Sequence, residues 1–330
     1  MSDVALAAGV SLKTVSRVVN GSEGVSAPKL ERVQSAINTL GFRRNESARQ
    51  LRQGTTATIG LVLEDVADPF YSALTRAVEE VALERNNMLL ASSAAEDPQR
   101  ARRLIELLGA RGIDGLIVTP SAGIDPAFLR AEAAAGSTMV FVDRPVSGFD
   151  VDTVLADNLG GARLGTELLL GHGHTRIAFF GDASSVYTAS ERRAGYVAAL
   201  TAAGLPVDEQ LIVMDSPTDD SAAAHLARAL ANPDPPTAIL GGNNRWSICL
   251  LRALRALDRT IAFVGFDDFE LADVLNPGIT VIAQDPAAMG RLAAGILFGR
   301  IDGDTSPPQR VQLGVSVVLR GSEAIDSRRG

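Results

Sequence analysis

The residues best suited to chemistry in this sequence are carboxylates, amides and arginines that recur beside aromatic side chains. A polyol needs such a mixture, because each hydroxyl both donates and accepts hydrogen bonds while the C–H faces of a sugar ring lie on aromatic rings. Any one of these residues is as easily explained by strand-end capping or by an ion pair within the fold. Together they indicate a binding site, and the candidates are Asp68, Phe70, Tyr71, Asp143, Arg144, Arg192, Asn243, Asp267 and Gln284.

The elements that must position these residues are short apolar runs that alternate with amphipathic patterns from Thr58 onward. We predict helices over 71–86 and 99–111, and strands over 58–64, 87–93, 113–120, 137–144, 175–182, 237–242 and 261–268. Alternating strands and helices favour parallel sheets with helices on both faces. Ligands of such sheets lie beyond the carboxyl ends of the strands, where Asp143, Asn243 and Asp267 are expected.

Charge is distributed unevenly along the 330 residues, whose formal net charge is −8. Residues 1–57 hold eight lysines and arginines against four aspartates and glutamates, so this segment carries +4 and the remainder −12. A basic head on an acidic chain is typical of a nucleic-acid-binding module joined to a part that does not bind nucleic acid, although surface charge also clusters by chance. A chain of this length is expected to form two or three domains.

The stretch "GVSLKTVSRVVNG", residues 9–21, has the pattern of a helix-turn-helix. Gly9 permits the positive φ that ends one helix, and Ser11 can cap the next. Val15, Val18 and Val19 then repeat at helical spacing, so the opposite face of the second helix is expected to be exposed. That face presents side chains suited to base edges and phosphates in a major groove, namely Leu12, Lys13, Ser16 and Arg17.

A third helix is expected after Ser26, with Pro28 in its first turn, where proline is well tolerated. Its predicted apolar stripe is Leu30, Val33, Ile37 and Leu40. Three short helices with a core of their own would make a small DNA-binding domain. Short helix-turn-helix patterns arise by chance in many helical proteins, but this one coincides with the basic segment.

Taken together, these features resemble the LacI/GalR family of bacterial transcriptional repressors, from about residue 2 to about residue 321. The head "DVALAAGVSLKTVSRVVNG", the third helix, the segment "NESARQLRQ" and the strand–helix core follow one another as they do in that family. The resemblance implies an all-α helix-turn-helix domain followed by an α/β core of two Rossmann-like lobes, similar to type I periplasmic binding proteins. It implies transcription regulation rather than catalysis, with no cofactor and no metal.

The resemblance also implies which residues touch DNA. The hinge, residues 45–53, would fold on operator DNA and insert Leu51 into the minor groove, where an apolar wedge kinks the duplex. Read without the family, the same segment is a polar linker, and Arg44 stands where the family usually has proline. The expected DNA contacts are Leu12, Lys13, Thr14, Ser16, Arg17, Asn20, Ala48 and Leu51, with Leu12, Lys13 and Arg17 as the chief base readers.

By the same resemblance, the nine candidate residues line an effector pocket between two lobes, for a small sugar rather than a purine. The expected domains are a head over 1–44, a hinge and linker over 45–57, and a core over 58–330. The expected lobes are 58–157 with 286–313, and 158–285 with 314–330. Nearby, Ser184, Ser185 and Tyr187 are expected to add specificity. Trp246 would lie either near the pocket mouth or half-buried on an ordinary helix.

Closure of the lobes on an effector would change the spacing of two hinges in a dimer, so we expect a homodimer on near-palindromic operator DNA. The effector's sign of action, inducer or co-repressor, stays open. The tail "SEAIDSRRG" lacks heptad leucines, which disfavours a coiled-coil tetramer. A single cysteine, Cys249, with no signal-peptide pattern and no long apolar stretch, favours a cytoplasmic, nucleoid-associated protein without membrane contact.

Three alternative functions would share some of these features. A transport-type sugar-binding protein would share the core, but it needs export and has no use for a basic head. A regulator that responds to a nucleoside, a purine or a sugar phosphate stays open. An enzyme is disfavoured: "GGARLG", residues 160–165, only imitates a dinucleotide motif after a weak strand, and His172 and His174 favour a surface turn over zinc.

Overall fold

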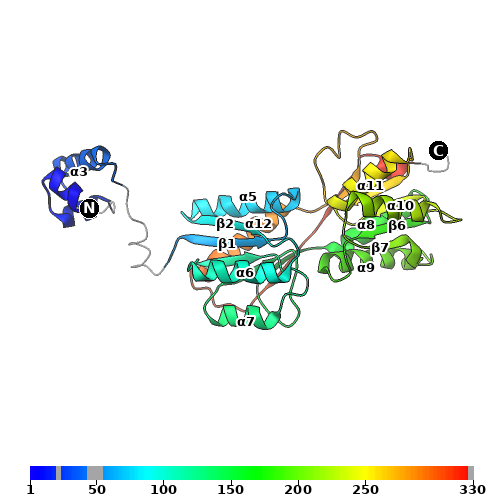
Figure 1. Ribbon diagram of the computed structural model, residues 1–330, viewed down its shortest axis with the longest axis horizontal. Helices are drawn as coiled ribbons and strands as arrows, with labels where there is room; N and C mark the ends of the chain where they lie inside the picture. The colour runs from blue at the N-terminus through cyan, green and yellow to red at the C-terminus, as the bar shows by residue number, and fades with distance from the viewer. Residues whose placement is uncertain (20–23, 43–54, 326–330) are drawn as a thin grey trace. The chain divides into compact units, whose positions relative to one another are not determined.

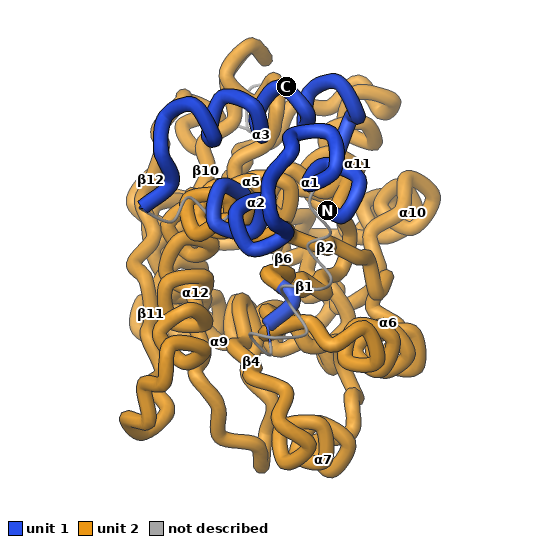
Figure 2. The backbone as a smooth tube through the Cα atoms, turned by 90° about the vertical axis from the view of Figure 1, so that its left-hand side faces the viewer, with its two compact units in different colours: residues 1–56 blue, residues 57–330 orange. Residues whose placement is uncertain are grey.

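The structure is a computed structural model that describes residues 1–19, 24–42 and 55–325. The chain divides into two compact units, residues 1–56 and residues 57–330 (Figure 2). The predictions for Asn20, Arg44, Ala48, Leu51 and the hinge over 45–53 concern residues outside the described ranges.

The first unit contains three short helices, α1 (Ser2–Ala8), α2 (Leu12–Val19) and α3 (Ala27–Thr39) (Figure 1). Helix α1 ends at Gly9, which adopts the left-handed conformation with φ 59°. Helix α2 begins after Ser11, whose hydroxyl accepts a hydrogen bond from the Thr14 amide at 3.2 Å. The predicted helix-turn-helix is therefore confirmed, and its turn is made by the expected residues.

A small apolar core holds the three helices together. Its buried members come from all three helices and are Val4, Ala8, Val15, Val33 and Ala36. The predicted stripe of α3 was partly wrong, because Leu30 and Leu40 are 45% and 49% exposed. Ala36 takes the inward position beside Val33 instead, because residues three apart share one face of a helix.

The second unit consists of two six-stranded sheets, each covered by helices on both faces (Figure 1). In the first sheet, all neighbours run parallel in the order β11-β5-β4-β3-β1-β2. Its strands are β1 (Thr58–Leu63), β2 (Met88–Ser93), β3 (Gly115–Val118), β4 (Met139–Val142), β5 (Thr153–Ala156) and β11 (Arg310–Leu313). Its helices are α5 (Pro69–Glu84), α6 (Pro98–Ala110), α7 (Pro126–Ala134) and α12 (Pro286–Ile301).

The second sheet has the order β12-β10-β9-β8-β6-β7 and is parallel except for the antiparallel pair β10 and β12. Its strands are β6 (Ile177–Gly181), β7 (Ile212–Met214), β8 (Ala238–Gly241), β9 (Ala262–Phe266), β10 (Thr280–Ala283) and β12 (Ser316–Val318). Its helices are α8 (Asn158–Gly171), α9 (Tyr187–Ala202), α10 (Asp219–Leu230) and α11 (Asn244–Ala256). Short 3₁₀ turns lie at Glu209–Leu211 and Ser322–Ala324.

The buried strands explain this layered arrangement. Strands β1, β3, β4, β6, β8 and β9 are buried along their whole length, as expected where helices cover both faces of a parallel sheet. In the first sheet, one apolar cluster packs under α5 and α12 and another under α6 and α7. In the second sheet, the clusters lie under α10 with α11 and under α8 with α9. The predicted two-lobe α/β core is therefore confirmed.

The chain passes from one sheet to the other after β5, after β10 and between β11 and β12. We call the part built on the first sheet the N-lobe and the part built on the second sheet the C-lobe. No helix among the described residues is long and apolar enough to cross a membrane.

Candidate functional site

In the head, α2 exposes the side chains expected to reach DNA. Leu12 is 52% exposed although it is apolar, and Lys13 and Arg17 are exposed as well. Thr14 and Ser16 are half-buried, and the Thr14 hydroxyl lies 2.9 Å from that of Ser11. An exposed leucine that shares a short helix with two exposed cations is available for contact with a partner.

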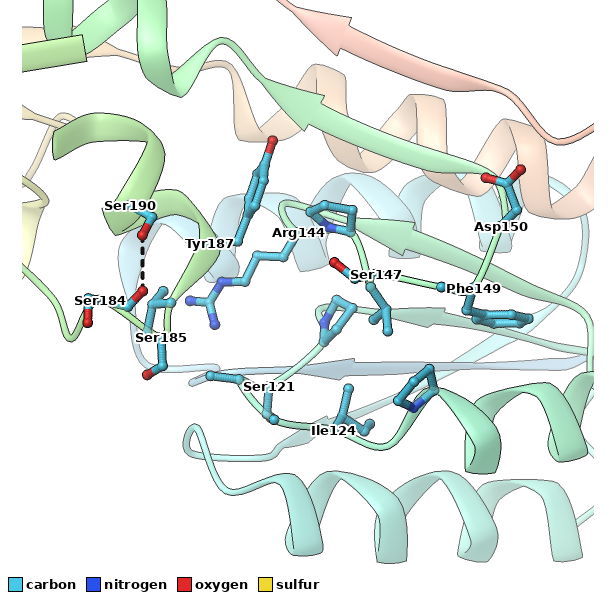
Figure 3. A pocket seen from close by; sticks show the side chains of 18 of the residues that line it. Ser121, Ile124, Arg144, Ser147, Phe149, Asp150, Ser184, Ser185, Tyr187 and Ser190 are labelled. Carbon is cyan, nitrogen blue, oxygen red and sulfur yellow. Dashed lines mark hydrogen bonds between the residues drawn. The ribbon is translucent and has the colours of Figure 1, made fainter. Parts of the chain in front are cut away.

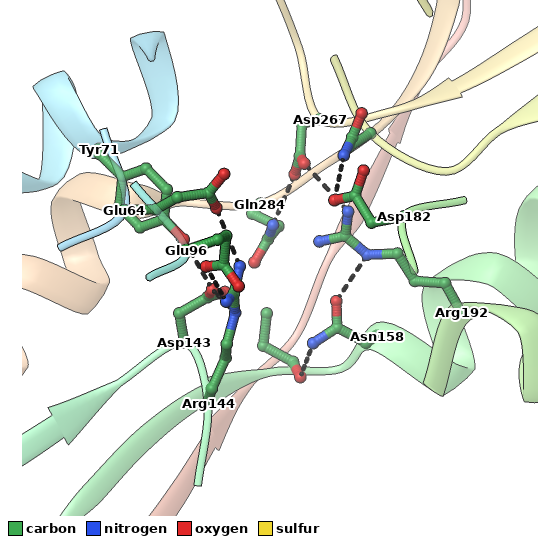
Figure 4. Close-up of polar contacts among 12 residues, drawn as sticks. Glu64, Tyr71, Glu96, Asp143, Arg144, Asn158, Asp182, Arg192, Asp267 and Gln284 are labelled. Carbon is green, nitrogen blue, oxygen red and sulfur yellow. Dashed lines mark hydrogen bonds and ion pairs between the residues drawn. The ribbon is translucent and has the colours of Figure 1, made fainter. Parts of the chain in front are cut away.

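In the core, all nine predicted effector residues line one small cavity between the lobes, of about 40 Å³, which we call the deep site. Figure 4 shows polar contacts among residues of this site, including Arg144, Arg192 and Asp267. Asp68 caps α5, Asn243 caps α11, and Arg192 lies on α9. Asp143 follows β4, Asp267 follows β9 and Gln284 follows β10. The carboxyl ends of the strands of both sheets therefore face one another across the cleft.

Arg192 is the centre of the C-lobe half of the deep site. It is buried and donates to Asp267 Oδ2 at 3.1 Å, to Asn158 Oδ1 at 2.7 Å and to the Gly242 carbonyl at 2.6 Å. Its guanidinium also lies 3.8 Å from the centre of the Phe266 ring. Helices α8 and α9 bring Arg192 and Asn158 together, because Gly195 lets the helices approach: a Cβ there would lie 2.1 Å from the Leu159 carbonyl oxygen.

The second oxygen of the Asp267 carboxylate accepts a hydrogen bond from Gln284 Nε2. Burial raises the pKa of Asp267, and the neighbouring Arg192 and Gln284 only partly offset that rise. Asp267 and Asp143 both adopt positive φ, 65° and 72°, which L-residues other than glycine rarely do. Strained backbone at two matching strand ends is typical of a functional site.

Arg144 is the centre of the N-lobe half. Its guanidinium donates to Glu64 Oε2 at 3.0 Å and to Glu96 Oε1, and its Nε lies 3.2 Å from Asp143 Oδ2. Tyr71 donates its hydroxyl to the same Asp143 oxygen at 3.0 Å. The Phe70 ring meets the Tyr71 ring edge to face at 5.0 Å, so an aromatic surface adjoins the charged groups.

Two of the contacts between the lobes lie at the deep site. Asn244 Nδ2 donates to Asp68 Oδ1 at 3.0 Å, and Arg245 Nη1 donates to Glu64 Oε1 at 3.3 Å. Asn244 and Arg245 begin α11 in the C-lobe, whereas Glu64 and Asp68 follow β1 in the N-lobe. The lobes are therefore closed on each other, and most polar groups of the deep site bond one another, whereas Asp182 Oδ1 and Gln284 Oε1 are buried without a hydrogen-bond partner among the described residues.

Carboxylates outnumber arginines around the deep site. The carboxylates are Glu64, Asp68, Glu96, Asp143, Asp182 and Asp267, and the arginines are Arg144, Arg192 and Arg245. Burial raises the pKa of Glu64 to about 7, although the Arg144 guanidinium lowers it. Burial likewise raises the pKa values of Asp68 and Asp182. Raised pKa values favour protonation and so remove part of this negative charge. The arginines are nevertheless already paired with carboxylates, which leaves little positive charge for an anionic ligand.

Two larger cavities open from the same cleft. One, the outer bay, has a volume of about 980 Å³, shares Arg144 with the deep site and includes the predicted specificity residues Ser184, Ser185 and Tyr187 (Figure 3). The other, the acidic bay, has a volume of about 450 Å³ and shares Glu64, Asp182 and Arg245 with the deep site. A ligand in the deep site can therefore extend in either direction.

Several residues of the site were not predicted. Glu64 and Asp182 directly follow β1 and β6, so the strand-end signal that selected Asp143 applies equally to them. Asn158, Glu96 and Arg245 have no comparable signal, because their contacts depend on how α8, α11 and the loop after β2 meet the rest of the cleft.

Three further expectations concern Trp246, the motif "GGARLG" and the histidine pair. Trp246 lies on helix α11, as one of the two expectations had it, but it is fully buried in the C-lobe core rather than half-buried, and its Nε1 donates to the Asp215 carbonyl. The segment before "GGARLG" is the buried strand β5 rather than a weak strand. Gly161 and Gly165 of that motif lie where a Cβ would contact Phe266 and Leu240, so they permit packing of α8 on its sheet. His174 is buried rather than at the surface, and its ring lies 3.1 Å from the Thr237 hydroxyl, so the expected surface turn was wrong at this residue.

Two family models match this chain, one over the helix-turn-helix head and the other over the two-lobe core. Residues 1–45 match the family described as bacterial regulatory proteins, lacI family, and residues 56–311 match periplasmic binding proteins and sugar binding domain of LacI family. The ribose operon repressor of Escherichia coli (strain K12) is 32% identical and covers 98% of this chain and 99% of its own length. The HTH-type transcriptional regulator CelR of Thermobifida fusca is 34% identical, over 97% of this chain and 96% of its own length.

Solved structures agree with these relatives. A lac repressor dimer bound to operator and the anti-inducer ONPF has a TM-score of 0.86 at 27% identity and covers 98% of both chains. A complex of the transcriptional regulator CelR with cellobiose has a TM-score of 0.74 at 33% identity, over 97% of this chain and 98% of that one. A helix-turn-helix head, a two-lobe core and relatives matched along their whole length leave one assignment: this chain is a member of the LacI family of bacterial transcriptional regulators.

Proposed function

We propose that this chain is a sequence-specific transcriptional repressor whose affinity for operator DNA is controlled by a small sugar bound between its lobes. The observation that carries the proposal is the deep site: buried carboxylates, arginines and amides converge there from both lobes beside two aromatic rings. Such a set matches the alternating donors and acceptors of a polyol. The exposed face of α2 supplies the DNA-binding half of the function.

A neutral sugar fits the deep site better than a phosphate. Its arginines are already paired with carboxylates, so little positive charge is left to hold an anion. Relatives point the same way, since one is named for the ribose operon, one for the maltose regulon, and one is solved with cellobiose. We therefore place a free sugar ahead of a sugar phosphate or a nucleotide.

Effector control requires a difference in affinity between two states of the core. The contacts of Asn244 with Asp68 and of Arg245 with Glu64 are made only while the lobes are closed. We propose that a bound sugar replaces part of this network and so changes the closure angle. We assign the lobes to 58–157 with 286–313 and to 158–285 with 314–330, and the head and hinge to 1–44 and 45–57.

On the DNA side, we propose that Leu12, Lys13 and Arg17 read bases, while Thr14, Ser16 and Asn20 support them. Ala48 and Leu51 are proposed as minor-groove contacts on sequence resemblance. Because a helix-turn-helix dimer presents two recognition helices, the operator is expected to be near-palindromic. We propose a homodimer that acts in the cytoplasm, on nucleoid DNA.

A thermal-unfolding screen of the full chain against free sugars, sugar phosphates and nucleosides tests the effector class. A ligand at about 100 times its dissociation constant adds about 2.7 kcal/mol of stability, which is readily measured. A shift with a free sugar supports the proposal. Shifts produced only by phosphorylated compounds or nucleosides would overturn the effector assignment and leave the DNA-binding assignment intact.

A further inference from the structure

The two lobes must part before any ligand larger than water reaches the deep site. In the closed arrangement the deep site has a volume of about 40 Å³, which is room for about one water molecule. Two contacts across it, from Asn244 to Asp68 and from Arg245 to Glu64, are lost when the lobes separate. Opening therefore changes the surroundings of both carboxyl groups, and any change in how tightly they bind protons is linked to closure.

Closure also brings carboxylates of the two lobes together. Asp182 follows β6 in the C-lobe, and it lines the same two cavities as Glu64 of the N-lobe. Each arginine of the site, Arg144, Arg192 and Arg245, is already paired with a carboxylate. Moving like charges toward one another and out of water costs free energy, and carboxylates avoid this cost by taking up protons.

The closed site is also short of hydrogen-bond donors. Three buried oxygen atoms around it have no hydrogen-bond partner among the described residues, namely Glu96 Oε2, Asp182 Oδ1 and Gln284 Oε1. All three are acceptors. A protonated carboxyl group carries an O–H donor, whereas a carboxylate has none. A proton bound in this cluster therefore supplies a donor and removes a negative charge at the same time.

Glu64 is the carboxyl group best placed to take up this proton. Its side chain is only 16% exposed, and it lies beside Arg144 and Glu96 (Figure 4). Burial raises its pKa to about 7, Arg144 lowers the pKa, and Glu96 and Asp182 raise it further. Charged and titratable groups surround it on every side: Asp68 and Tyr71 at the start of α5, Glu96 after β2, Asp143 and Arg144 after β4, Asp182 after β6 and Arg245 on α11.

We propose that closure of the lobes takes up protons, with Glu64 as the principal acceptor, so that acidification favours the closed core and alkaline pH favours the open one. The proton is then an effector in its own right, bound where the lobes meet. The inference rests on the proposed function only in assuming that the core opens and closes. It adds a second signal, which needs no sugar.

The direction of the effect follows from proton linkage. A carboxyl group whose pKa is higher in the closed state stabilises closure fully below its open-state pKa, and this contribution is lost as the pH rises through its closed-state pKa. On opening, the pKa of Glu64 falls from about 7 toward the ordinary 4.5, because water returns and Asp182 moves away. Burial also raises the pKa values of Asp68, Asp182 and Asp267, which adds to proton uptake in the same direction.

The spacing of the lobes measures closure without sugar or DNA. Ala127 on α7 of the N-lobe and Ala194 on α9 of the C-lobe are both exposed and can carry spin labels as cysteines in the full chain with Cys249→Ser. An excess of unlabelled chain ensures that one subunit of a dimer carries both labels. Double electron–electron resonance then gives the ratio of short to long distances, which should rise about tenfold from pH 8 to pH 5.5. A ratio that stays constant or falls would overturn the proposal.

Two variants identify the proton acceptor. Glu64→Gln keeps the shape of the side chain but cannot ionise, so the rise should shrink to about twofold or less. Arg245→Gln removes a cation that lowers the pKa of Glu64 in the closed core, so the midpoint of the rise should move to higher pH. Glu80→Gln, on α5 with 55% of the Glu80 side chain exposed, is the matched control and should change neither.

The outcomes separate this inference from the proposed function. A full rise in Glu64→Gln would overturn the inference, as would an Arg245→Gln variant in which closure changes equally at every pH. Neither result bears on sugar binding, because no sugar is present. Conversely, a silent sugar screen would overturn the sugar effector and leave proton-linked closure standing.

Discussion

The head and the deep site are both built from polar side chains on short elements, yet they differ in what those side chains do before a partner arrives. On α2, Leu12, Lys13 and Arg17 point into solvent. In the deep site, Arg144 and Arg192 are buried and each makes several bonds to protein groups. Exposed side chains of a DNA-binding surface are hydrated until DNA binds. Buried polar groups instead need hydrogen-bond partners within the protein until a ligand replaces them.

This difference predicts that substitutions in the two regions act on different quantities. In the deep site a lost partner leaves a buried charge, so stability falls together with ligand binding. On α2 a lost side chain removes only a contact with DNA, so affinity falls while stability stays.

The largest effect is expected at Asp267. Asp267→Ala leaves the Arg192 guanidinium buried without its carboxylate and should lower the free energy of unfolding by about 3–5 kcal/mol. Its neighbour gives the control, because Asp268 pairs with Arg320 at the surface and is 42% exposed along its side chain. Asp268→Ala should cost about 1 kcal/mol or less. Urea denaturation at pH 7 measures both, and equal losses would contradict the contrast.

A pH-dependent effect of intermediate size is expected at Glu64. Burial raises the pKa of Glu64 from 4.5 to about 7 in the folded chain, so folding takes up a proton at pH values between these two. The stability that this proton uptake contributes is fully present below pH 4.5 and is lost as the pH rises through 7. Relative to wild type, Glu64→Gln should therefore gain about 3 kcal/mol of stability between pH 4.5 and pH 8. Denaturation curves at the two pH values give the difference. A variant whose stability changes in parallel with wild type would show that this carboxyl is ionised throughout.

The smallest effect on stability is expected on α2. Arg17→Ala should change the free energy of unfolding by less than about 0.5 kcal/mol, because the side chain is exposed. It should weaken binding to operator DNA by about 1–3 kcal/mol. Arg76→Ala, with 82% of that side chain exposed on α5, is the control for loss of one positive charge. Fluorescence anisotropy with the DNA that the chain enriches most from random sequences compares the two. Similar losses in both variants would mean that Arg17 contributes only general charge.

The sequence allowed most of the fold to be predicted, for a physical reason. Buried parallel strands such as β1 and β9 are continuous apolar runs, and the turn at Gly9 needs a residue that tolerates positive φ. Where burial depends on tertiary packing, prediction was weaker. Leu30 matches the helical period of α3 but is exposed, and Trp246 lies wholly in the core.

The deep site divides in the same way. Strand-end residues such as Asp143 and Asp267 were found because parallel strands end at one edge of a sheet. The contact between Arg245 and Glu64 could not be predicted from the sequence, because it depends on how far the two lobes close on each other. Spacing along one lobe holds no information about the other. Asn158 and Glu96 were missed for another reason, because each bonds within one lobe through the packing of a helix or a loop.

The central claim is that one chain couples the two regions, and operator affinity measured with and without a bound sugar tests it most directly. For wild type, a saturating sugar found in the thermal screen should change operator affinity at least about tenfold, the usual scale of coupling between sites. Asp267→Asn, nearly identical in shape, should bind the operator as wild type does without sugar and should respond weakly or not at all. A sugar that binds the core tightly and leaves the operator affinity of wild type unchanged would contradict the account.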